Sequence, residues 1–148
     1  MIPTLLVISA VILVAAAYAI KRVRDRRELE RYSVTPEALH AMLTSHRDVV
    51  VLDVRLPLDL LAKSEIIPGA TRIAPHEVQG NPALIPQDRD VIVYCTCPSE
   101  KTSRAILHKA LALHLSRVKF LKGGLDGWKD KGYPVEPYTQ SFHLETGS

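Results

Sequence analysis

Cysteine is scarce in this chain of 148 residues: there are two, in the sequence Cys95-Thr96-Cys97. Two half-cystines separated by one residue cannot join distant parts of a fold. The sequence therefore excludes a scaffold held by disulfides and suits a reducing compartment. Aromatic residues are also few, at 5% of the chain.

Net charge is absent from most of the chain. Lysine and arginine number 19 and aspartate and glutamate 16, and residues 1–31 hold six of the former and three of the latter. Residues 32–148 are therefore neutral overall. Nucleic-acid binding normally needs a basic surface, so we expect no nucleic-acid partner.

One long hydrophobic run is present, and it comes first. Residues 2–20 contain no charged side chain. As a helix at about 1.5 Å per residue, the run would span roughly 28 Å, close to the hydrocarbon thickness of a bilayer. No lysine or arginine precedes it, unlike the start of a cleaved signal peptide. We expect a transmembrane helix over residues 1–20, with a cleaved signal as the alternative.

Five basic residues lie between Lys21 and Arg27, directly after this run. Because positive charge flanks the cytoplasmic end of membrane spans, we expect a single-pass protein with its following domain in the cytoplasm. Residues 21–33 are read as a basic juxtamembrane linker. Attraction to anionic lipid head groups is a second interpretation of these charges.

The rest of the chain alternates short β-branched runs with helical patterns. Strands are predicted over residues 49–55, 71–74, 91–95 and 118–121, and helices over residues 36–45, 56–62 and about 99–115. A tight turn over residues 123–128 is predicted to lead into a last short helix that ends at Gly132. Strands that alternate with helices indicate an α/β fold with a mostly parallel sheet. We expect one domain over residues 34–138, followed by a tail over residues 139–148.

Cys95 ends the apolar run of residues 91–94, and the helical pattern begins at about Ser99. Free amide N–H groups of a loop and a first helical turn would face the sulfur and favour its thiolate. An ordinary thiol has a pKa of about 8.5, and a fall of roughly two units would make the thiolate the major form near pH 7. We interpret Cys95 as a nucleophile; a buried, inert cysteine is the alternative.

Four motifs then appear in an order that resembles a single rhodanese domain over residues 34–137. They are Leu52-Asp53-Val54-Arg55, Ile67-Pro68-Gly69-Ala70, the strand leading to Cys95, and Gly123-Gly124-Leu125-Asp126-Gly127-Trp128 with Gly132-Tyr133-Pro134-Val135. The resemblance implies a rhodanese-like α/β fold, with a five-stranded sheet flanked by helices and, here, preceded by one transmembrane helix. A membrane segment before such a domain is similar to known anchored variants.

The same resemblance implies a sulfurtransferase that needs no cofactor. Cys95 would take a sulfane sulfur from thiosulfate, a polysulfide or a protein persulfide, and pass it to a thiol or another thiophilic acceptor. The loop after the cysteine would bind the substrate, and the residues we assign to it are Thr96, Cys97, Ser99, Glu100, Lys101 and Thr102.

This loop departs from the family pattern, since it contains neither glycine nor arginine. Lys101 is its one cation, and Arg104, one turn into the helix, is a second accessory candidate. These departures leave open a non-catalytic module that binds a partner or carries sulfur at the membrane. A phosphatase-like activity ranks third, because Lys101 stands where such enzymes place an arginine that clamps an oxyanion.

The roles of Cys97, Asp53 and Arg55 complete the candidate site. Cys97 is an accessory or resolving thiol, half of a soft-metal pair, or a polar loop residue. Since no histidine lies close to it in sequence, we predict no metal. Asp53 and Arg55 are expected to act structurally, by fixing the end of their strand through hydrogen bonds and an ion pair.

Overall fold

The computed structural model describes residues 1–96 and 101–140, with the backbone alone for Lys101. The chain divides into two compact units, Met1–Tyr32 and the residues from Ser33 onward. Each is described separately.

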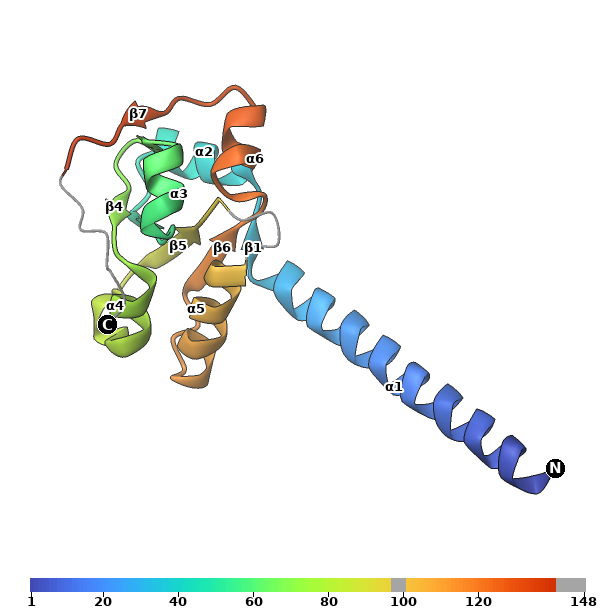
Figure 1. Ribbon diagram of the computed structural model, residues 1–148. Helices are drawn as coiled ribbons and strands as arrows, with labels where there is room; N and C mark the ends of the chain where they lie inside the picture. The colour runs from blue at the N-terminus through green and yellow to red at the C-terminus, as the bar shows by residue number, and fades with distance from the viewer. Residues whose placement is uncertain (97–100, 141–148) are drawn as a thin grey trace, which may run out of the picture. The chain divides into compact units, whose positions relative to one another are not determined.

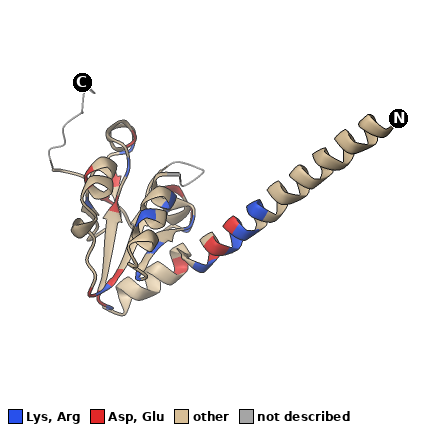
Figure 2. Cartoon of the chain, turned by 90° about the horizontal axis from the view of Figure 1, so that it is seen from below, with Lys and Arg blue, Asp and Glu red and all other residues tan. Residues whose placement is uncertain are grey.

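The first unit is one helix, α1 (Ile2–Arg31), none of whose residues is buried. Its most apolar window has a mean hydropathy of 2.3, and within residues 1–96 and 101–140 it is the one helix long and apolar enough to cross a membrane. Figure 2 shows that charged residues gather towards its C-terminal end. There Lys21 and Asp25, and Arg24 and Glu28, are spaced four residues apart, a spacing at which opposite charges support a helix. The helix therefore extends through most of the segment predicted as a linker.

The second unit is built on a five-stranded sheet in which every neighbouring pair of strands is parallel. Its strands, in spatial order, are β1 (Ser33–Val34), β6 (Val118–Leu121), β5 (Asp90–Tyr94), β2 (Val49–Asp53) and β4 (Thr71–Arg72). The α/β class and the five-stranded parallel sheet predicted from the sequence are confirmed.

Strand β5 lies at the centre of this sheet and is covered on both faces. Residues Val91, Ile92, Val93 and Tyr94 are each at most 1% exposed. A continuous apolar strand is what a parallel sheet with helices on both faces requires, because neither side of the strand meets water.

One face of the sheet packs against α2 (Pro36–Thr44) and α6 (Gly124–Asp130). Leu39 of α2 and Trp128 of α6 join Ile92 and Tyr94 of β5 in one buried cluster. Thr35 caps α2 by accepting a hydrogen bond from the N–H of Ala38 at 3.2 Å, as a Thr-Pro helix start predicts.

The other face carries α4 (Pro75–Gly80), the short 3-10 helix η1 (Pro82–Leu84) and α5 (Lys101–Ala112). Val78 of α4 and Ile106, Leu107 and Ala110 of α5 are at most 2% exposed. Helix α5 follows β5 and returns the chain to the start of the parallel strand β6, so its first turn lies at the carboxyl edge of the sheet (Figure 1).

A small antiparallel pair closes the unit beside α3 (Pro57–Ala62). Strand β3 (Glu65–Ile66) pairs with β7 (Glu136–Pro137), and the N–H of Tyr138 donates to the carbonyl of Ser64 at 2.8 Å. Neither this pair nor β1 was predicted, and residues 21–33, which we read as a linker, contain the first residue of β1. These strands carry no periodic pattern that would reveal them, whereas β4, equally short, lies within the predicted strand of residues 71–74.

Candidate active site

Cys95 comes directly after the central strand and is 2% exposed. Side chains alternate between the two faces along a strand. Ile92 and Tyr94 point to the face that holds Trp128. The alternation therefore directs Val93 and Cys95 to the opposite face, which α5 covers. Cys95 thus lies at the carboxyl edge of the sheet, at the end of its central strand.

The backbone of Cys95 is fixed by the turn that begins α6. The N–H of Leu125 donates to the carbonyl oxygen of Cys95 at 3.1 Å. Gly123 and Gly124 precede it with φ values of +79° and +57°, in the left-handed region that glycine adopts without strain. The Gly-Gly turn is thereby brought against the peptide of the candidate nucleophile.

Asp53 and Arg55 form a fully buried ion pair at the end of the neighbouring strand β2. The Nη2 of Arg55 lies 2.5 Å from Oδ2 of Asp53, and both side chains are inaccessible to solvent. The guanidinium also donates through Nη1 to the carbonyl of Lys63 and through Nη2 to that of Glu65, each at 2.7 Å. All three of its nitrogens donate within the fold and its side chain is inaccessible to solvent, so Arg55 is not placed to bind a substrate anion.

Burial by itself lowers the pKa of Arg55, but the hydrogen bond from Arg55 to Asp53 and the negative charge of that carboxylate outweigh it, and the pKa is raised. The guanidinium is thus positively charged at every relevant pH. The pair holds β2 to the segment of residues 63–65 that follows α3.

Tyr94 links this pair to the central strand. Its hydroxyl donates to Oδ2 of Asp53 at 3.0 Å and accepts from the N–H of Ile67 at 3.2 Å. Burial, and then the charge of Asp53, raises the pKa of Tyr94, so the phenol stays protonated as a donor. A network of Arg55, Asp53 and Tyr94 therefore supports the residue that precedes Cys95.

Comparison with known proteins identifies the family of this chain. Residues 35–131 match the model of the rhodanese-like domain. The chain belongs to the rhodanese-like family. A protein named "Sulfurtransferase" from Allochromatium vinosum is 30% identical over 106 residues, which are 69% of this chain and 92% of that protein.

Solved structures agree with this assignment. A rhodanese-related protein from Thermoplasma volcanium is 25% identical, covers 70% of this chain and 96% of its own, and has a TM-score of 0.59. A protein from Lactobacillus plantarum is 21% identical, covers 80% of this chain and 98% of its own, and has a TM-score of 0.68, which supports the fold.

The loop of this rhodanese domain is described in part. Of the predicted substrate-binding residues, Cys97, Ser99 and Glu100 lie outside the described residues, as does the side chain of Lys101. Thr96 is half-buried directly after Cys95, and Thr102 and Arg104 are half-buried in the first turn of α5. Among the described residues, no group of three or more histidine, cysteine or acidic side chains is arranged to hold a metal ion.

Ser103 is a residue that the sequence analysis missed. It is 1% exposed, although it lies in the first turn of α5 next to the loop of the rhodanese domain. Its spacing from Ile106 and Leu107, by three and four residues, places it on the buried face of the helix. That spacing was the signal by which the sequence could have identified it.

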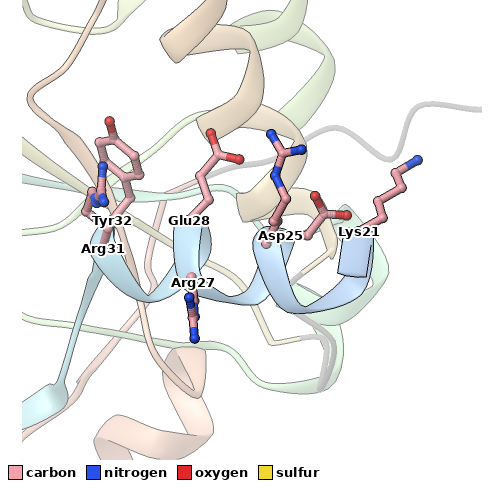
Figure 3. A pocket seen from close by; sticks show the side chains of 7 residues that line it. Lys21, Asp25, Arg27, Glu28, Arg31 and Tyr32 are labelled. Atoms are coloured by element: carbon pink, nitrogen blue, oxygen red, sulfur yellow. The ribbon is translucent and has the colours of Figure 1, made fainter. Parts of the chain in front are cut away.

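A separate hollow lies on α1, outside the rhodanese domain. Its lining is charged side chains and Tyr32, and Figure 3 shows Arg27 pointing to the side of the helix away from Glu28 and Tyr32. Every lining residue belongs to the last turns of one helix or its C-cap. A hollow bounded by side chains of one exposed helix encloses no ligand, and we assign it no function.

Proposed function

We propose that this protein is a membrane-anchored sulfurtransferase that carries a sulfane sulfur as a persulfide on Cys95. The observation that carries the proposal is the position of Cys95 in a rhodanese-like domain, directly after the central strand and before the loop that leads to α5. The naming of a 30% identical relative as a sulfurtransferase supports the same reaction.

The reaction takes two displacement steps. The Cys95 thiolate attacks the outer sulfur of thiosulfate; a bond forms between Sγ and that sulfur, and the S–S bond of the donor breaks as sulfite leaves with its electron pair. An acceptor thiolate then attacks the outer sulfur of the Cys95 persulfide. The acceptor leaves as a persulfide and Cys95 returns as a thiolate. A persulfide or polysulfide donor follows the same course with a thiolate as the leaving group.

The residues around Cys95 have separate roles in this proposal. Thr96, Thr102 and the amide groups at the start of α5 would bind the donor, with Lys101 or Arg104 supplying positive charge. Cys97 would act as an accessory thiol. Arg55 and Asp53 would position the strand ends without touching the substrate, which is supported by the engagement of all three guanidinium nitrogens within the fold.

The location of the reaction follows from α1. We propose that this helix anchors the chain in a membrane and that its charged end keeps the domain on the cytoplasmic side. A long helix of mean hydropathy 2.3 with no buried residue supports an anchor. A reducing cytoplasm would also keep Cys95 as a thiol.

Sulfur loading of the full chain in detergent tests the proposal. We would incubate wild type, Cys95→Ser and Cys97→Ser with thiosulfate and, separately, with glutathione persulfide, and follow the intact mass. We expect wild type to gain one sulfur atom, Cys95→Ser to gain none, and cyanide to remove the added sulfur. If folded wild type with free thiols gains no sulfur from either donor, the enzyme assignment is wrong and a binding module remains.

A further inference from the structure

We propose that the side-chain hydroxyl of Ser103, together with that of Thr96, binds the transferred sulfur on Cys95. The inference rests on the proposed sulfurtransferase function and assigns a further catalytic residue to that site. It adds neutral donors from the two ends of the loop to the positive charge that the proposed function assigns to Lys101 or Arg104.

The first observation is that these hydroxyls have no partner. In the part of the chain that the structure describes, the buried side-chain nitrogen and oxygen atoms without a hydrogen bond belong to Arg72, Thr96 and Ser103. A buried hydroxyl without a partner is costly in a folded protein, and such groups are rare. An acceptor that binds there during the reaction accounts for their retention.

The second observation is where the two hydroxyls lie in the chain. Thr96 directly follows Cys95, and Ser103 lies in the first turn of α5, on the far side of the same loop. Arg72, in contrast, lies on the edge strand β4 in register with Asp53. Asp53 and Tyr94 share the face opposite to the one to which the alternation directs Cys95. Arg72 is therefore not part of this group.

The third observation concerns the direction of Ser103. Ser103, Ile106, Leu107 and Ala110 follow the spacing of one helix face, and each is at most 1% exposed. This face packs on the side of the sheet to which Val93 and Cys95 point. The apolar members pack along the sheet, while Ser103, in the first turn of α5, brings a buried hydroxyl to the edge of the sheet at which Cys95 lies.

The transfer of sulfur to Cys95 creates an anion to which these hydroxyls can donate a hydrogen bond. When the Cys95 thiolate displaces sulfite from thiosulfate, negative charge moves to the outer sulfur of the new persulfide. A hydroxyl donates a hydrogen bond to that anion and stabilises the transition state in which the charge develops. In the unloaded enzyme the same hydroxyl lacks an acceptor, so it contributes to catalysis at a cost to stability.

Measuring both catalysis and stability distinguishes this role of Ser103 from a purely structural one. We would prepare the full chain in detergent as wild type, Ser103→Ala, Thr96→Val and Cys95→Ser, with Ser116→Ala as the control. Ser116 is exposed and lies beyond the far end of α5. The measurements are the rate of sulfur loading from thiosulfate, by intact mass, and the melting temperature of the unloaded protein.

We expect Ser103→Ala to load about tenfold to a hundredfold more slowly than wild type while its melting temperature is unchanged or higher. Thr96→Val should slow loading in the same direction, and Ser116→Ala should alter neither quantity. Loading of Ser103→Ala at the wild-type rate would overturn the inference and leave the proposed function intact. So would slower loading with a lower melting temperature. Absence of loading in wild type would overturn both.

Discussion

Gly124 lies so close to Cys95 that a side chain would collide with it. A Cβ atom on Gly124 would lie 2.0 Å from the carbonyl oxygen of Cys95, and the φ of +57° is one that other residues adopt only with strain. The next amide, from Leu125, donates to that same oxygen. The Gly-Gly turn is therefore the element that sets the peptide of the candidate nucleophile.

Gly124→Ala should destabilise the domain by more than its backbone strain alone. The left-handed conformation costs about 1–2 kcal/mol for a residue with a Cβ, and the collision with Cys95 adds to this because one of the two backbones must move. We expect a loss of about 3 kcal/mol or more in the free energy of unfolding. Urea unfolding measures it through the fluorescence of Trp128, the one tryptophan in the chain and 1% exposed.

Gly132→Ala is the matched control for this change. Gly132 has a φ of +75°, but a Cβ there would meet no atom within 4 Å. It should therefore lose only the backbone term, about 1–2 kcal/mol, and load sulfur like wild type. Equal losses for the two alanine variants would show that contact with Cys95 contributes nothing.

Tyr94→Phe should lower stability by about 1–3 kcal/mol near neutral pH, because Asp53 loses a donor and the N–H of Ile67 loses its acceptor. The loss of stability caused by Tyr94→Phe should become smaller at high pH. Burial raises the pKa of Tyr94 in the folded state above the value of about 10 in the unfolded chain. The stability from Tyr94 is fully present below pH 10 and is lost as the pH rises beyond it.

We therefore expect the advantage of wild type over Tyr94→Phe to shrink by up to about 1.4 kcal/mol per pH unit above pH 10. Unfolding in urea between pH 8 and pH 11 measures this difference. Tyr133→Phe is the control, because it keeps the ring that stacks on His40 at 4.1 Å and leaves the Asp53 network untouched. A constant difference between wild type and Tyr94→Phe across this range would contradict the assignment.

Arg55→Met should be strongly destabilising, because it leaves the carboxylate of Asp53 buried without its cation. Loss of one partner of a buried pair costs about 3–5 kcal/mol. Asp53→Leu should cost a similar amount, because it leaves the guanidinium of Arg55 buried without its carboxylate. The double variant should lose less than the two single losses added together, since neither charge is then left alone.

The double-mutant cycle is measured from urea unfolding of the four proteins, with Trp128 as the probe. Additive losses would argue against a coupled pair, and the carbonyls of Lys63 and Glu65 would then be the main partners of Arg55. The surface pair of Arg89 and Asp48, at 3.2 Å, provides a comparison that should change stability by less than about 1 kcal/mol.

A helix or strand could be predicted from the sequence where its own residues form a recognisable apolar or capping pattern. Strand β5 is a continuous apolar run, and α2 begins with a Thr-Pro cap, so both were identified from local residues. Strands β1, β3 and β7 were not, because their residues form no strand pattern of their own and each strand exists through its partner. The residues of a short strand do not indicate a partner strand that lies far away in the sequence.

The candidate site was predictable to the same extent. Cys95 was identified from its place after β5, and the residues around Asp53 from a motif. Ser103 was missed because a serine near the start of a helix is usually read as a polar residue facing solvent. Its burial comes from the packing of α5 on the sheet, and its lack of a hydrogen-bond partner is visible only in three dimensions.

The anchor proposed for α1 is tested by placing a charge within it. Val14 lies in the middle of the apolar run, and an arginine there would oppose insertion by about 2.5–3.5 kcal/mol. Val14→Arg should therefore shift the chain from the membrane fraction to the soluble or aggregated fraction. The measurement is the share of the full chain that stays with membranes after extraction with alkaline carbonate.

Val23→Arg is the matched control, since it makes the same change on the same helix within the basic segment that follows the run. It should leave the membrane fraction unchanged. Protease added to inside-out vesicles should digest the rhodanese domain, whereas protease outside intact cells should not, if the domain is cytoplasmic. The mass of the purified chain decides between an anchor and a signal, because only an anchored chain retains residues 1–20. An unchanged membrane fraction for Val14→Arg would contradict insertion of α1.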